Sequence, residues 1–312
     1  MLCNRVFCIK FQNKWLFELH SIIYSPFFEK YYPKKKMHNK KDQFTKDGFL
    51  VLNDFYSGSK CDNLITRANE LARQYEIRQG VSVFQTTEQS KTTDDYFLES
   101  GNNISFFFEK DAFDEKGILV QSLEKSFNKI GHALHDLDDI FNDFSRSQEL
   151  KELSSELGYG NYRIIQSMFI FKHAKIGGVV DVHQDSTFLY TEPDSCIGYW
   201  FALEDATIEN GCLWAKPGGH DTPLRSRFRR KPEGGTEMEI LDDTPFLMDG
   251  MIPLEVKKGT CIVLHGLLPH YSLPNTSGKP RPAYSIHTID PEKFYPNDNW
   301  LQRNKSLLLR GF

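Results

Sequence analysis

Short segments rich in β-branched and aromatic residues recur along the chain, and Gly, Pro and Asn separate them. Segments of this kind favour β-strands, and the residues between them favour turns. They are residues 48–52, 163–171, 179–183, 196–203, 212–215, 259–265 and 281–288. Many short strands without alternating helices indicate a mainly β protein, and we expect a jelly-roll barrel.

Two other segments have the apolar spacing of helices. Residues 61–75 repeat apolar side chains at Leu64, Ala68 and Leu71, which predicts an amphipathic helix. The same kind of spacing predicts a helix over residues 122–137, which would place Lys129 within a helix. We therefore expect helices to flank the barrel.

The tripeptide His183-Gln184-Asp185 offers two different metal ligands. Successive side chains of a strand point to opposite faces, so His183 and Asp185 would share a face. Two histidines and one carboxylate on one face of an octahedron leave the other positions open, which suits Fe(II) and oxygen chemistry. The tripeptide therefore predicts two of the three ligands of a non-haem iron site.

The residues alone do not decide which histidine completes the site. His265 and His270, on either side of a turn, are equal candidates, and His173, His220 and His287 compete with them. Zinc accepts the same ligand types in open sites, so a metal-dependent hydrolase is an alternative. A catalytically idle barrel that binds metal or a keto acid is a further one.

Six blocks of sequence carry a family resemblance. They are residues 106–117, 128–135, 166–172, 183–193, 203–214 and 217–220, and they occur in order between about Phe44 and about Trp300. Together they resemble the phytanoyl-CoA dioxygenase (PhyH) family. The resemblance implies a double-stranded β-helix, which is a cupin-like jelly roll. It also implies an enzyme that uses Fe(II), 2-oxoglutarate and O2 to hydroxylate a small-molecule substrate, and that releases succinate and CO2.

The resemblance also assigns site residues. It implies that the metal ligands, which are also the catalytic residues, are His183, Asp185 and His270, and that Arg281 holds the distal carboxylate of 2-oxoglutarate. Arginine suits this role because its planar guanidinium can donate two charge-assisted hydrogen bonds to one carboxylate. Further residues implied around the cosubstrate are Lys129, Met168, Trp200 and Ser272. Pro280 and Pro282 flank Arg281, which predicts a sheet edge or a bulge there.

Charge limits the kinds of partner. The net charge is −4 and the sequence pI is about 6.2, which argues against nucleic acid or an anionic membrane as partner. One basic cluster stands out: Arg225, Arg227, Arg229, Arg230 and Lys231. A run of this kind is usually a solvated loop, but near a barrel mouth it could attract an anionic substrate such as an acyl-CoA. The substrate itself is not predicted.

The N-terminal 36 residues differ in character from the rest. Apolar residues alternate there with Arg5, Lys10 and Lys14, and no apolar stretch reaches the length of a membrane span. We expect residues 1–36 to be an accessory extension and residues 37–312 to be a single dioxygenase domain. We also expect a monomer in the cytoplasm; mitochondrial targeting by the extension is a weaker alternative, and the end Leu309-Arg-Gly-Phe312 carries no peroxisomal signal. The six cysteines lack close pairing and predict free thiols.

Overall fold

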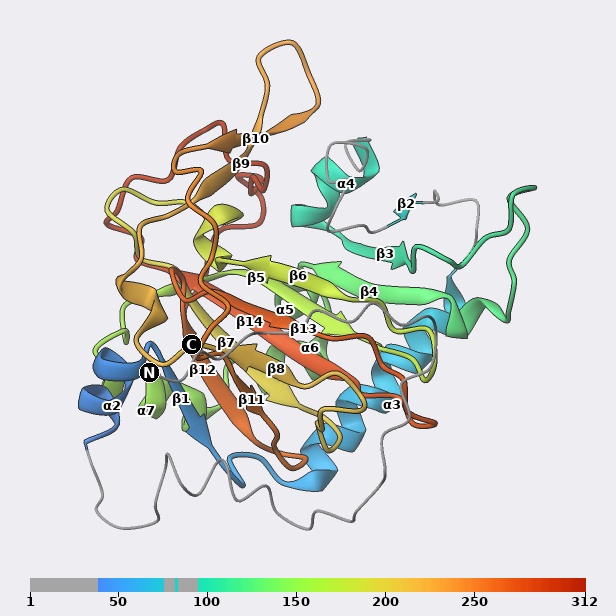
Figure 1. Cartoon of the computed structure of the whole chain (residues 1–312). Coiled ribbons are helices and arrows are strands. Elements are labelled where there is room, and N and C mark those ends of the chain that lie inside the picture. Colours follow the sequence, from blue (N-terminus) through green and yellow to red (C-terminus); the bar gives the residue numbers. More distant parts are fainter. Residues whose placement is uncertain (1–38, 76–81, 84–94) are drawn as a thin grey trace, which may run out of the picture. The chain divides into compact units, whose positions relative to one another are not determined.

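The computed structural model describes residues 39–75, 82–83 and 95–312 (Figure 1), and these residues belong to one compact unit, Lys36–Phe312. The predicted extension lies outside them, so the domain boundary stays a prediction.

Two β-sheets form the core of the fold, as expected for a jelly roll. The larger sheet has the strand order β1 (Phe49–Leu52), β12 (Cys261–His265), β7 (Ile197–Ala202), β14 (Ala283–Ile289), β5 (Arg163–Ile170), β4 (Phe127–His132), β3 (Ile104–Phe108) and β2 (Ser82–Val83). All its neighbours are antiparallel except the short pair β2 and β3. The smaller sheet has the order β11 (Ile252–Leu254), β8 (Leu213–Ala215), β13 (His270–Ser272) and β6 (Val180–His183). The seven predicted strand segments are confirmed.

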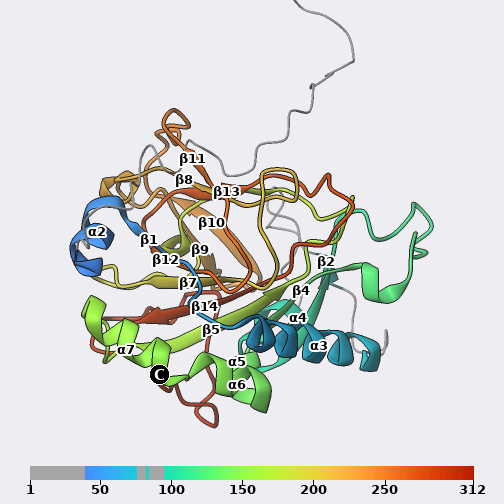
Figure 2. The ribbon, with the colours of Figure 1, turned by 90° about the horizontal axis from the view of Figure 1, so that it is seen from below.

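Helices cover the outer face of the larger sheet. They are α3 (Gly58–Gln74), α5 (Leu134–Leu137), α6 (Asp139–Ser145) and α7 (Gln148–Leu157), and Figure 2 shows them on the side of the larger sheet away from β8, β11 and β13. The predicted helix over residues 61–75 is confirmed as α3, which begins after the Ser57 cap and buries Cys61, Leu64, Ala68 and Ala72. Aromatic side chains such as Phe141 and Tyr284, 5.1 Å apart, fill the space between helices and sheet. The opposite face of the larger sheet is not covered by these helices, and residues of its strands line a cavity between the two sheets.

The predicted helix over residues 122–137 is wrong. The segment forms a short 3-10 turn at Leu123–Lys125, then strand β4, and only α5 is helical. Strand β4 lies between β3 and β5 and is buried on both faces, so its apolar residues do not alternate as they would in a half-exposed strand. Lys129 therefore lies in a strand and is only 7% exposed.

The predicted edge at Arg281 is also wrong. Strand β14 begins at Ala283, after both prolines, and lies in the middle of the sheet between β7 and β5. The prolines therefore do not interrupt the strand. The backbone N–H of Arg281 donates to the carbonyl of Lys172 at 3.1 Å, so the prolines remove no hydrogen bond from the sheet. A bulge does occur in β14, but at His287 and Thr288.

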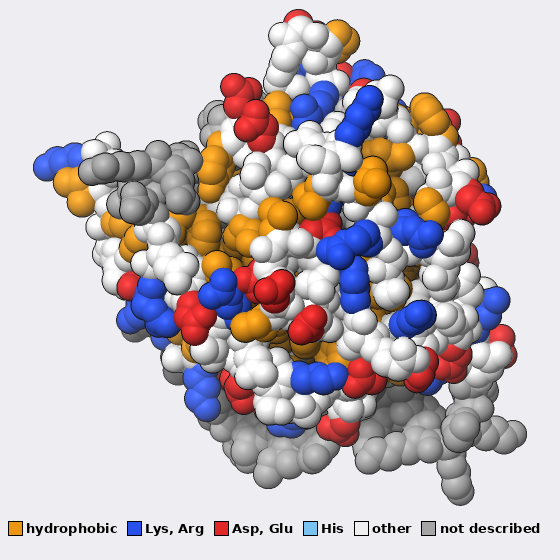
Figure 3. Space-filling view, turned by 180° about the vertical axis from the view of Figure 1, so that it is seen from behind, with side chains coloured by type: hydrophobic (Ala, Val, Ile, Leu, Met, Phe, Trp, Pro, Cys, Tyr) orange, Lys and Arg blue, Asp and Glu red, His pale blue; other side chains and the backbone are white. Residues whose placement is uncertain are grey.

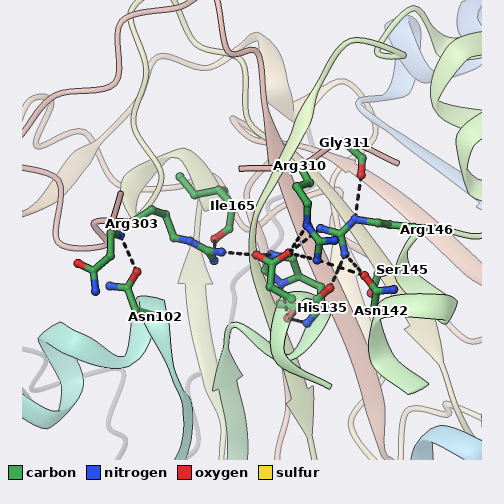
Figure 4. Close-up of polar contacts among 12 residues, drawn as sticks. Asn102, His135, Asn142, Ser145, Arg146, Ile165, Arg303, Arg310 and Gly311 are labelled. Carbon is green, nitrogen blue, oxygen red and sulfur yellow. Dashed lines mark hydrogen bonds and ion pairs between the residues drawn. The ribbon is translucent and has the colours of Figure 1, made fainter. Parts of the chain in front are cut away.

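The buried carboxylate of Asp136 forms ion pairs that link the C-terminal segment to the helical layer. The guanidinium groups of Arg146, Arg303 and Arg310 converge beside His135 (Figure 4), where all three pair with the carboxylate of Asp136, whose side chain is fully buried. Arg146 also donates to the carbonyl of Gly311 at 3.0 Å. These contacts join helix α5 to residues close to the C-terminus.

The surface carries no dominant patch of one charge on the face that Figure 3 shows, where basic and acidic side chains are interspersed. No helix in the described part of the chain is long and apolar enough to cross a membrane. Cys61, Cys196, Cys212 and Cys261 are buried free thiols, as predicted, whereas Cys3 and Cys8 lie outside the described residues.

Candidate metal centre and cosubstrate cavity

Three predicted ligands meet where two strands of the smaller sheet pair. His183 is the last residue of β6, and His270, the first residue of β13, lies directly opposite it in the antiparallel register. Asp185 follows two residues after His183, at the start of a 3-10 turn (Asp185–Thr187) rather than within the strand. The cross-strand pair therefore brings together residues that lie 87 positions apart in the sequence.

The geometry of these three side chains suits a metal ion. The Nε2 atoms of His183 and His270 lie 3.6 and 3.7 Å from Oδ1 of Asp185. One potential ligand atom from each residue lies within 4.8 Å of the other two. Such a group can hold one ion from one side and leave its other positions open.

Hydrogen bonds orient both imidazoles toward the same point. Nδ1 of His183 lies 2.8 Å from the carbonyl of Asp181, and Nδ1 of His270 lies 3.0 Å from the carbonyl of Leu268. A carbonyl can only accept, so each Nδ1 carries the proton and each Nε2 is left with its lone pair. Burial lowers the pKa of His270 to about 4, which keeps its ring neutral. Both rings are thus presented as metal ligands.

Asp185 is held as a carboxylate. Its burial would by itself raise the pKa, but the neighbouring His287, His270 and His183 outweigh burial and hold the pKa well below its usual range. Nε2 of His287 lies 3.3 Å from Oδ2, the oxygen more distant from the other two ligands. A Cβ at Gly198 would lie only 3.0 Å from the same oxygen, so a glycine gives the carboxylate its space.

The other histidines weighed from the sequence do not complete the triad. His265 accepts a hydrogen bond from the N–H of Leu267 and lies against His220, outside the cavity. His173 stacks on Phe171 at 5.1 Å. His287 does line the cavity, but its nearest contact with Asp185 is to Oδ2, whereas His183 and His270 lie nearest to Oδ1.

All eight predicted site residues line one cavity of about 270 Å³. The triad lies on the smaller sheet and the turn after it, whereas Lys129, Met168 and Trp200 come from β4, β5 and β7 of the larger sheet. Ser272 lies two residues after His270 on β13 and is 1% exposed. The cavity is close to the lower end of the volumes typical of small-molecule sites.

Arg281 is the largest fully buried side chain of the described residues. Its guanidinium lies 5.3 Å from the ring centre of Trp200. Among the residues described, Nε and Nη1 have no hydrogen-bond partner. Burial lowers the pKa of Arg281 to about 10, which still leaves it charged at neutral pH. A buried cation with donors aimed at no acceptor is costly unless an anion binds there.

Sequence reasoning missed one further cation in the cavity. Lys172 lies just after β5, is 2% exposed, and donates to the hydroxyl of Ser272 at 2.9 Å. A lysine that follows a strand gives no sequence signal, because an exposed lysine there would look the same. Lys129 is similarly buried, and burial lowers the pKa of each of these two lysines to about 7.

The predicted basic cluster is not a free anion site. Strand β9 (Ser226–Arg230) pairs with β10 (Thr236–Ile240), and Ser226 and Phe228 of β9 line the cavity, but none of the four arginines does. Alternation along the strand places Arg227 and Arg229 on the face opposite Ser226 and Phe228, whereas Arg225 precedes the strand and Arg230 is its last residue. Arg227 pairs with Asp298 at 2.8 Å and Arg229 with Glu237 at 2.9 Å. The remaining cations pair as Arg225 with Asp242, Arg230 with the carbonyls of Leu98 and Trp300, and Lys231 with Glu233.

A jelly roll with two histidines and a carboxylate beside a buried cation defines the class of a non-haem metal oxygenase barrel. Residues 44–283 match the family described as phytanoyl-CoA dioxygenase (PhyH). The chain belongs to this family of dioxygenase enzymes, as the sequence resemblance indicated.

Individual relatives agree with this assignment. The chain is 44% identical to a phytanoyl-CoA dioxygenase of Arabidopsis thaliana over 85% of this chain and 93% of the relative. It is 42% identical to the phytanoyl-CoA dioxygenase domain-containing protein 1 homolog of Dictyostelium discoideum, over 84% and 95% of the two chains. Among solved structures, the epimerase SnoN in complex with Fe3+, α-ketoglutarate and nogalamycin RO shares the fold, with a TM-score of 0.60, 14% identity, and 88% and 91% of the two chains covered.

Proposed function

We propose that this protein is an Fe(II)- and 2-oxoglutarate-dependent dioxygenase that hydroxylates a small molecule. His183, Asp185 and His270 would hold the iron, and Arg281 would receive the distal carboxylate of 2-oxoglutarate. When bound, iron and 2-oxoglutarate would allow O2 to serve as the oxidant: one oxygen atom enters the hydroxylated product and the other enters succinate, and CO2 is released. Related structures, among them the SnoN complex, are consistent with this pair of cofactors.

The observation that carries the proposal is the buried guanidinium of Arg281 in the same cavity as the triad. Metal-dependent hydrolysis needs the triad but has no required use for this cation. A keto acid needs both groups, because one end chelates the metal and the other end carries a second carboxylate. The triad and this guanidinium line the same small cavity, and this supports the keto acid over the zinc hydrolase.

The residues of the chain have separate tasks in this scheme. Asp185 and the two histidines bind and orient the metal from one side. Arg281 and Ser272 orient the keto acid, and the ring of Trp200 packs against the guanidinium. Residues of both sheets line the cavity, and a substrate that displaces water from it would strengthen each of these electrostatic contacts.

We assign the substrate to the apolar part of the cavity. Phe188, Phe228, Met238 and Phe246 line it, and three of these four residues come from β9, β10 and the segment that follows. Because the neighbouring arginines are already paired, the cluster no longer favours an acyl-CoA as substrate. We therefore include acyl-CoA thioesters among small molecules to be tested, without preference for them.

The test is an anaerobic titration of the purified apoprotein with Fe(II) and then 2-oxoglutarate, followed by visible absorption. We expect a charge-transfer band that needs both additions and that is lost in Asp185→Ala. Measured metal binding without this band would refute the proposal and favour the hydrolase. If the band forms but admission of O2 then yields no succinate, with or without candidate substrates, the idle barrel is favoured.

A further inference from the structure

Lys172 occupies an unusual place for a lysine. It follows strand β5, is 2% exposed, and has a φ of 41°, in the left-handed region that non-glycine residues seldom adopt. Both the burial and this backbone conformation are unfavourable for a lysine, so other contacts must offset them. The surroundings of its ammonium group show which contacts these are.

The ammonium group reaches the cavity between two loops and a strand. Nζ donates to the carbonyl of Gly178 at 2.6 Å and to the hydroxyl of Ser272 at 2.9 Å. The stem of the side chain passes Gly211, where a Cβ would lie 2.7 Å from Cε of Lys172. The glycine therefore leaves room for the lysine, and the contacts fix the ammonium beside Ser272.

This contact decides which way the hydroxyl of Ser272 can donate. A lysine ammonium has only donors, so Oγ of Ser272 must accept from Lys172. The hydrogen of the hydroxyl is then directed away from Lys172. Ser272 lines the cavity that also contains Arg281, and a carboxylate bound there could accept this hydrogen.

We propose that Lys172 is a positioning residue for 2-oxoglutarate, which directs the Ser272 hydroxyl at the distal carboxylate and adds a second positive charge beside Arg281. This inference rests on the proposed function, which it extends to a residue that the family resemblance did not assign.

The backbone of Lys172 supports the same part of the site. Its carbonyl accepts from the backbone N–H of Arg281 at 3.1 Å and from the side-chain amide of Asn275 at 2.9 Å. One residue thus fixes the hydroxyl of Ser272 through its side chain and the start of the segment that carries Arg281 through its backbone.

The charged groups around Lys172 favour the binding of one more anion. Burial and then the charge of Arg281 lower the pKa of Lys172 to about 7, although Glu109 and Cys212 act in the opposite direction. Glu109 is itself buried, and burial raises its pKa. A keto acid carboxylate between Arg281 and Ser272 would stabilise the charged form of Lys172.

The test compares two keto acids on the full-length protein loaded with Fe(II) without oxygen. Both 2-oxoglutarate and pyruvate can chelate the metal, but pyruvate lacks the distal carboxylate. We expect Lys172→Met to raise the dissociation constant of 2-oxoglutarate by about ten- to hundredfold, as for loss of a charged hydrogen-bond partner, and to leave that of pyruvate unchanged. The matched control is Lys175→Met, because Lys175 also has a positive φ of 70° but is exposed, with its ammonium on the carbonyl of Thr276.

Each outcome bears on the inference. Unchanged affinity for 2-oxoglutarate in Lys172→Met would overturn it, and an equal loss for both keto acids would overturn it in favour of a general packing role. If the methionine variant does not fold, Lys172→Gln replaces it, since glutamine keeps a donor for Ser272 without the charge and should show an intermediate loss for 2-oxoglutarate alone. If the wild-type protein binds Fe(II) but neither keto acid, the proposed function itself fails.

Discussion

Nε2 of His287 lies 3.3 Å from Oδ2 of Asp185, while Oδ1 of the same carboxylate lies 3.6 and 3.7 Å from the imidazoles of His183 and His270. The two oxygens of Asp185 therefore have different neighbours. His287 contacts one oxygen, and the two predicted histidine ligands lie nearest to the other. Partners of this kind orient the ligands of metal sites.

His287→Phe should weaken Fe(II) binding by about ten- to hundredfold, the usual effect of losing such a partner. The reason is that Oδ2 of Asp185 would lose its polar contact and the carboxylate could rotate. Metal titration by calorimetry, without keto acid, measures this. His265→Phe is the control, since His265 is a partly buried histidine outside the cavity. Equal metal affinity in the wild type and His287→Phe would show that the contact is incidental.

Gly198→Ala should also disturb the metal site. A Cβ there would lie 3.0 Å from Oδ2 of Asp185, and Gly198 is held between β12 and β14 in a central strand, so its backbone has little freedom to move away. We expect Fe(II) affinity to fall by about tenfold through displacement of the carboxylate. Gly278→Ala serves as the control, because nothing lies within 4 Å of its Cβ position. If both variants bind Fe(II) like the wild type, the space at Gly198 is not needed.

Arg281→Ala should leave Fe(II) binding intact and weaken 2-oxoglutarate binding. Loss of one partner of a buried charged pair costs about 2–5 kcal/mol, which corresponds to a loss of about thirtyfold or more. Arg281→Lys should recover only part of this affinity, because an ammonium cannot donate two parallel hydrogen bonds to one carboxylate. Titration with 2-oxoglutarate at saturating Fe(II) distinguishes the three proteins. Identical dissociation constants would place the distal carboxylate elsewhere.

Asp136→Asn should destabilise the protein without affecting the cavity. The change leaves Arg146 and Arg303 buried without their carboxylate, which costs about 3–5 kcal/mol in comparable cases. Unfolding by urea at pH 7 measures the difference. The fraction that remains folded should bind Fe(II) as the wild type does, and wild-type stability in this variant would contradict the role of the cluster.

The same carboxylate predicts a dependence of stability on pH. Burial would raise the pKa of Asp136, but the contacts with His135, Arg310 and Arg303 outweigh it and lower the pKa below its ordinary value. A lowered pKa in the folded state contributes stability that is present above the ordinary carboxyl pKa, about 4, and is lost as the pH falls below it. The difference in unfolding free energy between the wild type and Asp136→Asn should therefore shrink below about pH 4. A difference that stays constant down to pH 3 would show that Asp136 contributes no such stability.

Some parts of the site could be predicted from the sequence because they depend on local order. His183 and Asp185 lie two residues apart and face the same point even though a turn begins at Asp185. Ser272 follows His270 by two residues along β13 in the same way. Local spacing did not distinguish His270 from His265, and only the family resemblance chose between them.

Other parts could not be predicted because they depend on which strands become neighbours. The segment around Lys129 has apolar spacing that fits a helix, but it forms strand β4, which is buried on both faces between its neighbouring strands. The arginines of β9 look available in the sequence, but β10 and Asp298 supply their partners. His287 looked like a rival ligand, and the pairing of β14 with β7 placed it behind Asp185 instead.

The sequence by itself determined the strand-rich class of the fold, the ligand types and the family, since these depend on residue identity and on short spacing. Only the tertiary structure decided that Arg281 lines the cavity with two donor atoms that have no hydrogen-bond partner among the described residues, and that the arginines of β9 are paired. Arg281 and Arg227 are alike as residues, yet one is buried with donors aimed at no acceptor and the other is bound to carboxylates. The physical reason is that the free energy of a charge is set by its surroundings, and contacts between distant segments create those surroundings.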